Sequence, residues 1–349
     1  MQDRRGFLVG LGAAALAPGA SWADMGHPVA LTAAKTGEGH FALIGLRADG
    51  SVAFRQPLPA RGHAAAAHPF AAEAVHIARR PGTFALVIDC AGGRVLQQLK
   101  TPADRHFYGH AAFTADGTYL LTTENDLTTG RGIVGIWDRR KSYQRVAEVP
   151  SGGVGPHEII RLDTGGFAVA NGGIRTHPAT GRAKLNLGTM RPNLTFMDAS
   201  AQILGRVEGP DRLNSLRHIA ALPGGEVLCG FQWQGDVFEA PPLLALCRGG
   251  QLDAVHVEER MHRRLMGYIG SVAASGADWT ATAPRGGIVL SVSSGKLQTL
   301  NAPDGCGVAM SDGQTLITDG LGHVHALASG RLDRRALHPV AFDNHLVRV

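Results

Sequence analysis

The run DGTYLLTT at residues 116–123 shows the pattern on which the fold prediction rests. A turn-forming Asp-Gly pair is followed by six residues rich in strand formers, and its glycine tolerates the left-handed backbone of a tight hairpin turn. Another strand-like run, GIVGIWD, follows at residues 132–138. The stretch therefore predicts a β-hairpin with a further strand beside it.

The same turn signal recurs seven times along the chain. Its instances are centred on Gly50, Gly82, Gly117, Gly165, Gly224, Gly276 and Gly313. Successive glycines are 32 to 59 residues apart, and seven equal units over residues 24–349 would have about 47 residues each, the size of a four-stranded blade. Blades stacked in a ring cover sheet faces that one unit could not bury. We therefore predict an all-β fold, a single-domain seven-bladed β-propeller over residues 24–349.

Composition supports a globular fold and argues against a nucleic-acid partner. Of the 349 residues, 44% are hydrophobic, enough for a large core, and 47 glycines with 18 prolines suit a chain that turns often. The 34 basic and 29 acidic residues are interspersed without a basic block. Since nucleic-acid binding needs a concentrated positive surface, we expect no such partner.

The first 23 residues have the features of an export signal. Arg4 and Arg5 precede an apolar run that starts at Phe7, and Ser21 and Ala23 are small residues at positions −3 and −1 of a cleavage site. The apolar run is shorter than the roughly 20 residues that span a bilayer. We expect twin-arginine export of the folded protein to the periplasm, cleavage after Ala23 and no membrane span in the mature chain. The alternative is a fortuitous arginine pair before a core helix.

Histidines precede three of the predicted hairpin turns at similar distances. His110, His157 and His218 lie 7, 8 and 6 residues before the glycines of their turns. The innermost strand of a propeller blade begins, and the second strand ends, at the same face of the ring. We therefore expect residues at both positions to converge on one mouth of the central channel.

Candidate ligands at this mouth come from several blades. They are His106, His110, Glu124, His157, Glu158, Asn171, Arg175, His177, His218 and Arg285. Imidazole and carboxylate donors suit iron or another transition metal such as Zn, Cu or Mn. The histidines could instead hydrogen-bond neighbouring blades, or act as acid and base in pairs such as His157 with Glu158 or His110 with Glu124. No His-Glu-x-x-His motif is present, so the interpretation depends on convergence in space.

The longest insertions fall in the fourth and fifth units, around residues 174–190 and 232–242, where loops of this size often carry function. The first contains Arg175, His177, Arg182 and Lys184 and could close over an anion or chelate, or could be pinned to the next blade. Residues 255–265 could form a short surface helix or only a solvated connection. Cys229 and Cys247 could form a disulfide or remain two buried thiols.

Several motifs together resemble the bacterial domain-of-unknown-function family numbered 1513. They are RHFYGH (105–110), TEND (123–126), GPHE (155–158), ANGGIRTHP (170–178), SLRH (215–218), YIGS (268–271) and APRGG (283–287). The likeness extends over the whole chain after residue 23. It implies a periplasmic propeller exported by the twin-arginine route, encoded beside imelysin-like proteins and a di-haem, peroxidase-like oxidoreductase, and hence a part in iron acquisition. The resemblance implies no catalytic residues.

Three functions follow as hypotheses. The favoured one is a periplasmic binding or accessory protein of iron acquisition that holds a metal, a metal complex or an imelysin-like or di-haem partner at the histidine-rich mouth. The second is a hydrolase or oxidoreductase that uses a His–Glu pair. The third is an interaction scaffold in which the histidines only lock blades together, so that their loss would lower stability without the loss of a ligand.

Overall fold

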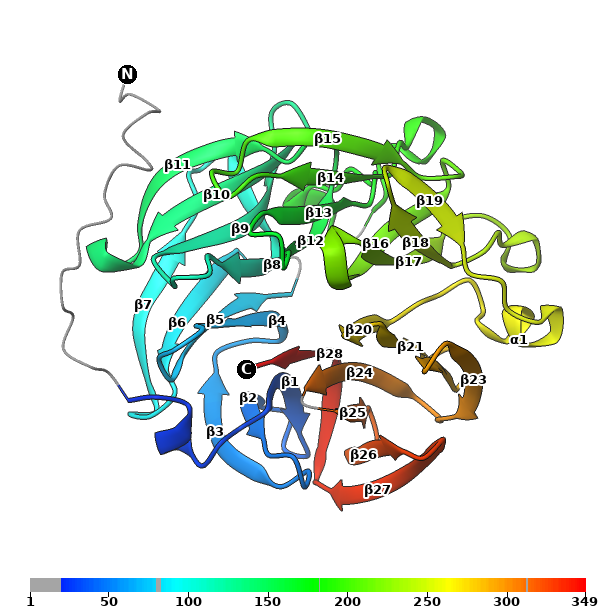
Figure 1. Cartoon of the computed structure of the whole chain (residues 1–349). Coiled ribbons are helices and arrows are strands. Elements are labelled where there is room, and N and C mark those ends of the chain that lie inside the picture. The colour runs from blue at the N-terminus through cyan, green and yellow to red at the C-terminus, as the bar shows by residue number, and fades with distance from the viewer. Residues whose placement is uncertain (1–19, 80–82, 182, 312) are drawn as a thin grey trace.

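Seven four-stranded antiparallel sheets form a ring around a central channel (Figure 1). The computed structural model describes residues 20–79, 83–181, 183–311 and 313–349. Each sheet is one blade, and its strands follow one another outward from the channel. The prediction of an all-β, seven-bladed propeller is confirmed.

Blades 1 to 4 contain the following strands. Blade 1 consists of β28 (Val340–Arg348), β1 (Ala30–Thr36), β2 (Phe41–Leu46) and β3 (Val52–Leu58). Blade 2 consists of β4 (Gly62–Ala67), β5 (Glu73–Ala78), β6 (Phe84–Asp89) and β7 (Arg94–Lys100). Blade 3 consists of β8 (Arg105–Phe113), β9 (Tyr119–Asp126), β10 (Gly132–Asp138) and β11 (Gln144–Pro150). Blade 4 consists of β12 (Pro156–Arg161), β13 (Phe167–Asn171), β14 (Asn193–Met197) and β15 (Ile203–Glu208).

Blades 5 to 7 complete the ring. Blade 5 consists of β16 (Asn214–Ala221), β17 (Val227–Trp233), β18 (Leu244–Arg248) and β19 (Gln251–Ala254). Blade 6 consists of β20 (Ser271–Ser275), β21 (Asp278–Ala283), β22 (Ile288–Ser293) and β23 (Lys296–Asn301). Blade 7 consists of β24 (Gly305–Ser311), β25 (Gln314–Asp319), β26 (His323–Ala328) and β27 (Arg331–Leu337).

Blade 1 closes the ring because it takes strands from both ends of the chain. Its innermost strand is β28, which pairs antiparallel with β1 from Ala30 opposite Arg348 to Thr36 opposite Val340. Figure 1 shows β28 next to β1 and β24 at the centre of the molecule. This pairing covers the edge that β1 would otherwise expose.

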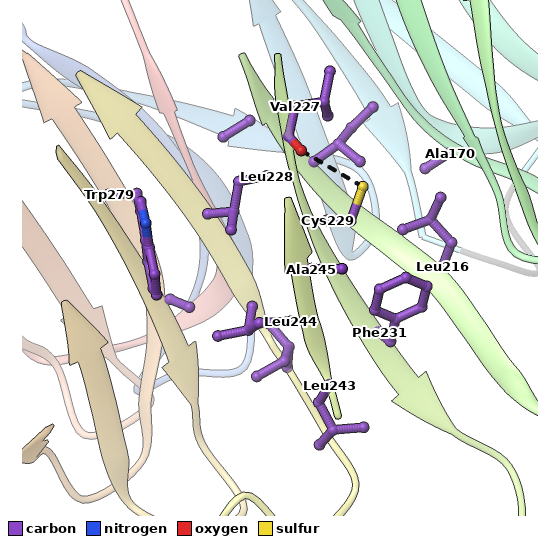
Figure 2. Packing of buried hydrophobic residues seen from close by; sticks show 14 of the residues in the cluster. Ala170, Leu216, Val227, Leu228, Cys229, Phe231, Leu243, Leu244, Ala245 and Trp279 are labelled. Atoms are coloured by element: carbon purple, nitrogen blue, oxygen red, sulfur yellow. Dashed lines mark hydrogen bonds between the residues drawn. The ribbon is translucent and has the colours of Figure 1, made fainter. Parts of the chain in front are cut away.

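The core lies between neighbouring blades. One cluster joins blades 4, 5 and 6, with Leu216 and Phe231 on one side and Trp279 on the other (Figure 2). Strands inside a blade, such as β17, are covered on both faces, whereas five consecutive residues of the outermost strand β7 are exposed. Apolar surface is thus buried by blade stacking, as a sheet with two covered faces requires.

The glycine turns occupy two different places in the blades. The turns at Gly117, Gly165, Gly224, Gly276 and Gly313 join the first and second strands of blades 3 to 7. The turn at Gly50 instead joins β2 and β3, the two outer strands of blade 1. Residues 81–82 lie outside the described part of the chain. The inner turn of blade 2, at residues 68–72, contains no glycine, which is why the sequence pattern passed over it.

Of the two alternatives for residues 255–265, the short surface helix is the one present, as α1 (Glu259–Arg264), which has no buried residue. No helix in the described ranges is both long and apolar enough to cross a bilayer. Cys229 and Cys247, on neighbouring strands of blade 5, are free and buried, as are Cys90 and Cys306, so the optional disulfide is absent.

The arginine pair of the predicted export signal lies outside the described residues, whereas the proposed cleavage site is within them. Trp22 is buried, and its indole donates a hydrogen bond to the backbone oxygen of His68 (2.8 Å). Ala72 N–H bonds to the oxygen of Ala20 (2.7 Å). Residues 20–25 therefore pack against blade 2, while cleavage after Ala23 stays a prediction.

Candidate functional site

Interruptions of strand pairing on the innermost strands turn side chains toward the channel. His63 falls in the irregular stretch of β4, His110 in that of β8 and His157 in that of β12. In β28 the stretch contains His345, and in β16 it contains Arg217, next to His218. Regular alternation would point strand side chains at the blade faces, and a β-bulge changes that direction. The bulges therefore account for the concentration of imidazoles in the channel.

Five histidines from five blades form one cluster. The ring centroids of His63 and His345 are 4.4 Å apart. The ring centroid of His110 lies 4.5 Å from that of His345 and 4.8 Å from that of His157. His218 completes the group at 5.0 Å from His157 and 5.1 Å from His345. One ring nitrogen each from His63, His110 and His345 lies within 4.8 Å of the other two. We call these five residues the histidine cluster.

A carboxylate lies against the cluster. Glu158 Oε1 is 3.5 Å from His110 Nδ1, and Glu158 Oε2 is 3.4 Å from His218 Nδ1. The backbone N–H of Ile219 also donates to Oε2 (3.0 Å). Burial raises the pKa of Glu158 to about 7, against the opposing effect of His345. The carboxyl group thus changes charge near neutral pH.

Four of the five clustered imidazoles are neutral at pH 7. Burial lowers the pKa of His218 and of His345 to about 3. Burial also holds the pKa values of His110 and His157 well below their usual range, and the nearby Arg217 guanidinium adds to the effect. A neutral imidazole keeps a nitrogen lone pair, which is the form that binds metals.

Two buried ring nitrogens in the cluster have no hydrogen-bond partner within the described part of the chain: His110 Nε2 and His157 Nδ1. Buried polar atoms usually have a partner, and a metal or ligand can take that role. The donor set of neutral imidazoles with one carboxylate suits first-row transition metals. The residues therefore fit such an ion.

Above the cluster the channel opens into a cavity of about 620 Å³. Imidazoles of His157, His218 and His345 form part of its lining. Lys184, from the loop after β13, and Gln234, from the loop after β17, line it as well. The two long insertions noted in the sequence thus reach the channel mouth.

Four of the predicted site residues lie at this mouth or directly beneath it. They are His110, His157, His218 and Glu158, and the structure brings them together as described above. Arg285, in the loop between β21 and β22, lines the cavity, with its guanidinium 4.3 Å from the ring centroid of Tyr268. A ligand role for any of them stays a prediction.

Two predicted site residues instead stabilise the interior of their own blades. Glu124 is fully buried, where its carboxylate accepts from Arg145 Nη2 (2.6 Å) and from Thr122 Oγ1 (2.7 Å). Asn171 donates to the backbone oxygen of Ser151 (3.0 Å), and its side-chain oxygen accepts from the hydroxyl of the same serine (2.6 Å). The expected placement of Glu124 beside the histidines, and its pairing with His110, is therefore wrong, because its side chain points at β11.

Three further candidates lie away from the cavity lining. His106 is buried in β8 opposite Asn125. Arg175 packs its guanidinium against Gly130 of blade 3. His177 accepts a hydrogen bond from Ala179 N–H at Nδ1 and caps a short turn (3.2 Å). The loop of residues 172–192 is thus partly pinned to blade 3, while Lys184 faces the cavity.

Sequence reasoning missed two members of the cluster, His63 and His345. The turn that follows β4 begins at His68 and contains no glycine. His63 lies five residues before His68, so a search from that turn could have found it. His345 belongs to an innermost strand supplied by the far end of the chain, which no local signal marks.

A second group of possible ligands lies in blade 7. Asp319 Oδ2 is 2.9 Å from His323 Nδ1 and 3.3 Å from His325 Nε2. The other carboxylate oxygen accepts from the backbone N–H groups of Leu321 and His323, so Asp319 also caps the turn between β25 and β26. These hydrogen bonds already explain the arrangement, and the group serves below as a control.

Comparison with known proteins identifies a family and the fold. A model of the family described as "Protein of unknown function (DUF1513)" matches residues 56–349. No curated protein matches the chain.

Solved structures with a similar fold have unrelated sequences. A structure described as streptogramin B lyase has a TM-score of 0.55 at 12% identity, covering 79% of this chain and 83% of its own. The computationally designed protein Ika8 has a TM-score of 0.56 at 13% identity, covering 90% and 89%. A chain of the mitotic checkpoint complex has a TM-score of 0.56 at 12% identity, covering 82% of both. At such identities the likeness extends to the fold alone.

Proposed function

The chain belongs to the DUF1513 family of proteins of unknown function, and from the site itself we propose that it binds a transition metal at the histidine cluster. The observation that carries the proposal is the convergence of five imidazoles on one channel, with the ring centroids of neighbouring members 4.4 to 5.1 Å apart. Five blades supply these rings through bulges in their innermost strands. Locking blades together does not require the rings of five blades to meet one another.

Charge supports a binding role more than a purely structural one. Four imidazoles kept neutral by burial lower stability in acid, and the nitrogens without partners in His110 and His157 lower it further. A bound metal would give both nitrogens a partner. Imidazole donors suit Zn, Cu, Fe and Ni, so the donor set selects borderline ions over Mg²⁺ or Ca²⁺.

Among these ions we propose iron, in agreement with what the family resemblance implies about iron acquisition. The protein would act in the periplasm as a binding or accessory component. Its ligand could be passed to or from an imelysin-like or di-haem protein, and the open mouth of the cavity gives such an exchange a route.

A cobalt titration tests the metal site, because Co²⁺ bound to nitrogen donors has a visible absorption band that reports coordination. Chelator-treated wild-type protein is titrated beside His157→Ala, His110→Ala and the double control His323→Ala/His325→Ala. We expect one equivalent of Co²⁺ to bind the channel of the wild type and of the control, and each channel variant to bind at least about tenfold more weakly. Iron content of protein purified from periplasm extends the test to the natural ion.

Urea unfolding of each variant separates ligand loss from misfolding. Equal Co²⁺ affinity of wild type, His110→Ala and His157→Ala would refute the proposal. Loss of Co²⁺ binding only in the blade 7 control would show that the metal site consists of Asp319, His323 and His325.

The position of Glu158 favours one second candidate, an enzyme that transfers protons at the same site. A carboxyl group with a pKa of about 7 between two imidazoles suits general acid–base catalysis near neutral pH. A substrate screen with wild type and Glu158→Gln tests it. Activity that disappears in Glu158→Gln while Co²⁺ binding persists would establish the enzyme, and a screen without turnover would count against it.

A further inference from the structure

We infer that the channel mouth is a binding site for a small anion that carries two or three carboxylates. This anion would occupy the cavity described above. Binding of the anion as a metal complex rests on the proposed function, whereas binding of the anion alone does not.

Four basic residues from four blades surround the cavity: Arg79, Lys184, Arg217 and Arg285. Arg79 follows β5 in blade 2, and Arg217 lies on β16 in blade 5. Lys184 comes from the long loop of blade 4 and Arg285 from the β21–β22 loop of blade 6. We call these four residues the basic collar. A ligand in the cavity would meet positive charge from several directions.

Carboxylates balance only part of this charge. Arg79 Nη1 is 2.8 Å from Asp343 Oδ1, but the other oxygen of Asp343 is bound by Arg61 (2.8 Å). Neither Lys184 nor Arg285 forms a salt bridge with any residue that the structure describes. A cavity with net positive charge attracts anions.

Electrostatic effects on Lys184 agree with a net positive charge in the cavity. Burial lowers the pKa of its ammonium group, and repulsion from Arg217 and Arg285 lowers it further. The three groups therefore act on one another across the cavity. An anion placed among them would relieve that repulsion.

Neutral groups in the cavity also suit carboxylate oxygens. The face of Tyr268 supports the Arg285 guanidinium at 4.3 Å, which leaves the N–H edge of the guanidinium available for two parallel hydrogen bonds. Asn344 Nδ2 donates to the Tyr268 hydroxyl oxygen (3.1 Å), so the hydroxyl hydrogen can point elsewhere. Donors held at several points match a ligand with several carboxylates.

The size and floor of the cavity narrow the ligand class further. A volume of about 620 Å³ lies in the range of small-molecule sites and excludes a macromolecule. The floor includes the rings of His157, His218 and His345, and the basic collar lies around them. If the proposed metal site is correct, a polycarboxylate chelate would place its metal at the imidazoles and its carboxylates at the collar.

Calorimetric titration with citrate tests the anion site on chelator-treated protein in low salt. The cavity variant Lys184→Gln/Arg285→Gln is compared with Lys296→Gln/Arg260→Gln, which removes two exposed basic residues on β23 and α1. We expect the wild type and this matched control to bind citrate alike, and the cavity variant to bind it at least about tenfold more weakly. Glucose serves as the neutral control ligand, and phosphate serves as the simple anion with which citrate is compared.

Three results would overturn the inference. The first is that the wild type binds no citrate at about 10 mM, a concentration far above that at which a built site should saturate. The second is that the cavity variant binds citrate with the same affinity as the wild type. The third is that the wild type binds phosphate as tightly as citrate. The proposed metal site can fail separately: His110→Ala, which changes a member of the histidine cluster outside the cavity lining, should lose Co²⁺ but keep citrate. Conversely, Lys184→Gln/Arg285→Gln should lose citrate but keep Co²⁺.

Discussion

Acid should destabilise the metal-free protein because unfolding exposes imidazoles that the folded protein keeps neutral. Burial lowers the pKa of six histidines: His68, His76, His110, His157, His218 and His345. In the unfolded chain each takes up a proton near its ordinary pKa of 6.5. Between about pH 7.5 and 5.5 the unfolded state therefore binds more protons, and stability falls as the pH falls.

The size of the effect follows from these shifts. Each imidazole that is protonated only on unfolding contributes between about 1 and 2 kcal/mol over this interval, so six together contribute roughly 8 kcal/mol. Glu158 has the opposite sign: its pKa is raised to about 7 in the folded protein, so protonation there stabilises the fold as the pH falls. This offsets about 2 kcal/mol and leaves a net loss of roughly 6 kcal/mol, a large part of the stability of a typical domain.

Urea unfolding at the two pH values measures the loss. His157→Gln removes one titrating ring from the histidine cluster, so we expect its loss to be smaller than that of the wild type by about 1 kcal/mol. His40→Gln is the control, because His40 is exposed at the surface of blade 1 and should leave the difference unchanged. Equal stability of the wild type at both pH values would refute the reasoning, as would an identical loss in His157→Gln.

Three further predictions test the site and its surroundings. Gly109→Ala should weaken Co²⁺ binding at least about tenfold, because a Cβ at this left-handed position would overlap the His63 ring; unchanged binding in the cobalt titration would place His63 outside the metal site. Glu124→Gln should cost about 3 kcal/mol in urea unfolding, because it removes the buried carboxylate charge that pairs with the partly buried Arg145 guanidinium, yet citrate and Co²⁺ should bind as before; a loss of either would show that Glu124 belongs to the site. The four cysteines should resist a thiol reagent in the native state and all react in urea, since each is buried and burial raises the pKa of Cys90 and Cys306 to about 12; rapid native reaction would contradict this.

The strand pattern of the sequence was sufficient for the fold and for three of the five members of the histidine cluster. Glycine turns at regular intervals, each followed by strand-forming residues, predict blades because hairpin chemistry is local. The same spacing placed His110, His157 and His218 at one mouth, since a blade's first strand begins and its second ends on the same face. These inferences needed only the repeat and the geometry of an antiparallel pair.

The chain alone determined an architecture and a set of histidines in register with it, because turn residues and strand propensity act over a few neighbours. Only the tertiary structure decided which side chains meet. Closure of the ring by β28 brings His345 beside His63, residues 282 positions apart in the chain, and bulges rotate the rings toward the axis. Glu124 looked equivalent to them in sequence but turns toward Arg145, since its strand continues in regular alternation. Convergence of this kind depends on contacts between distant segments, which no local pattern encodes.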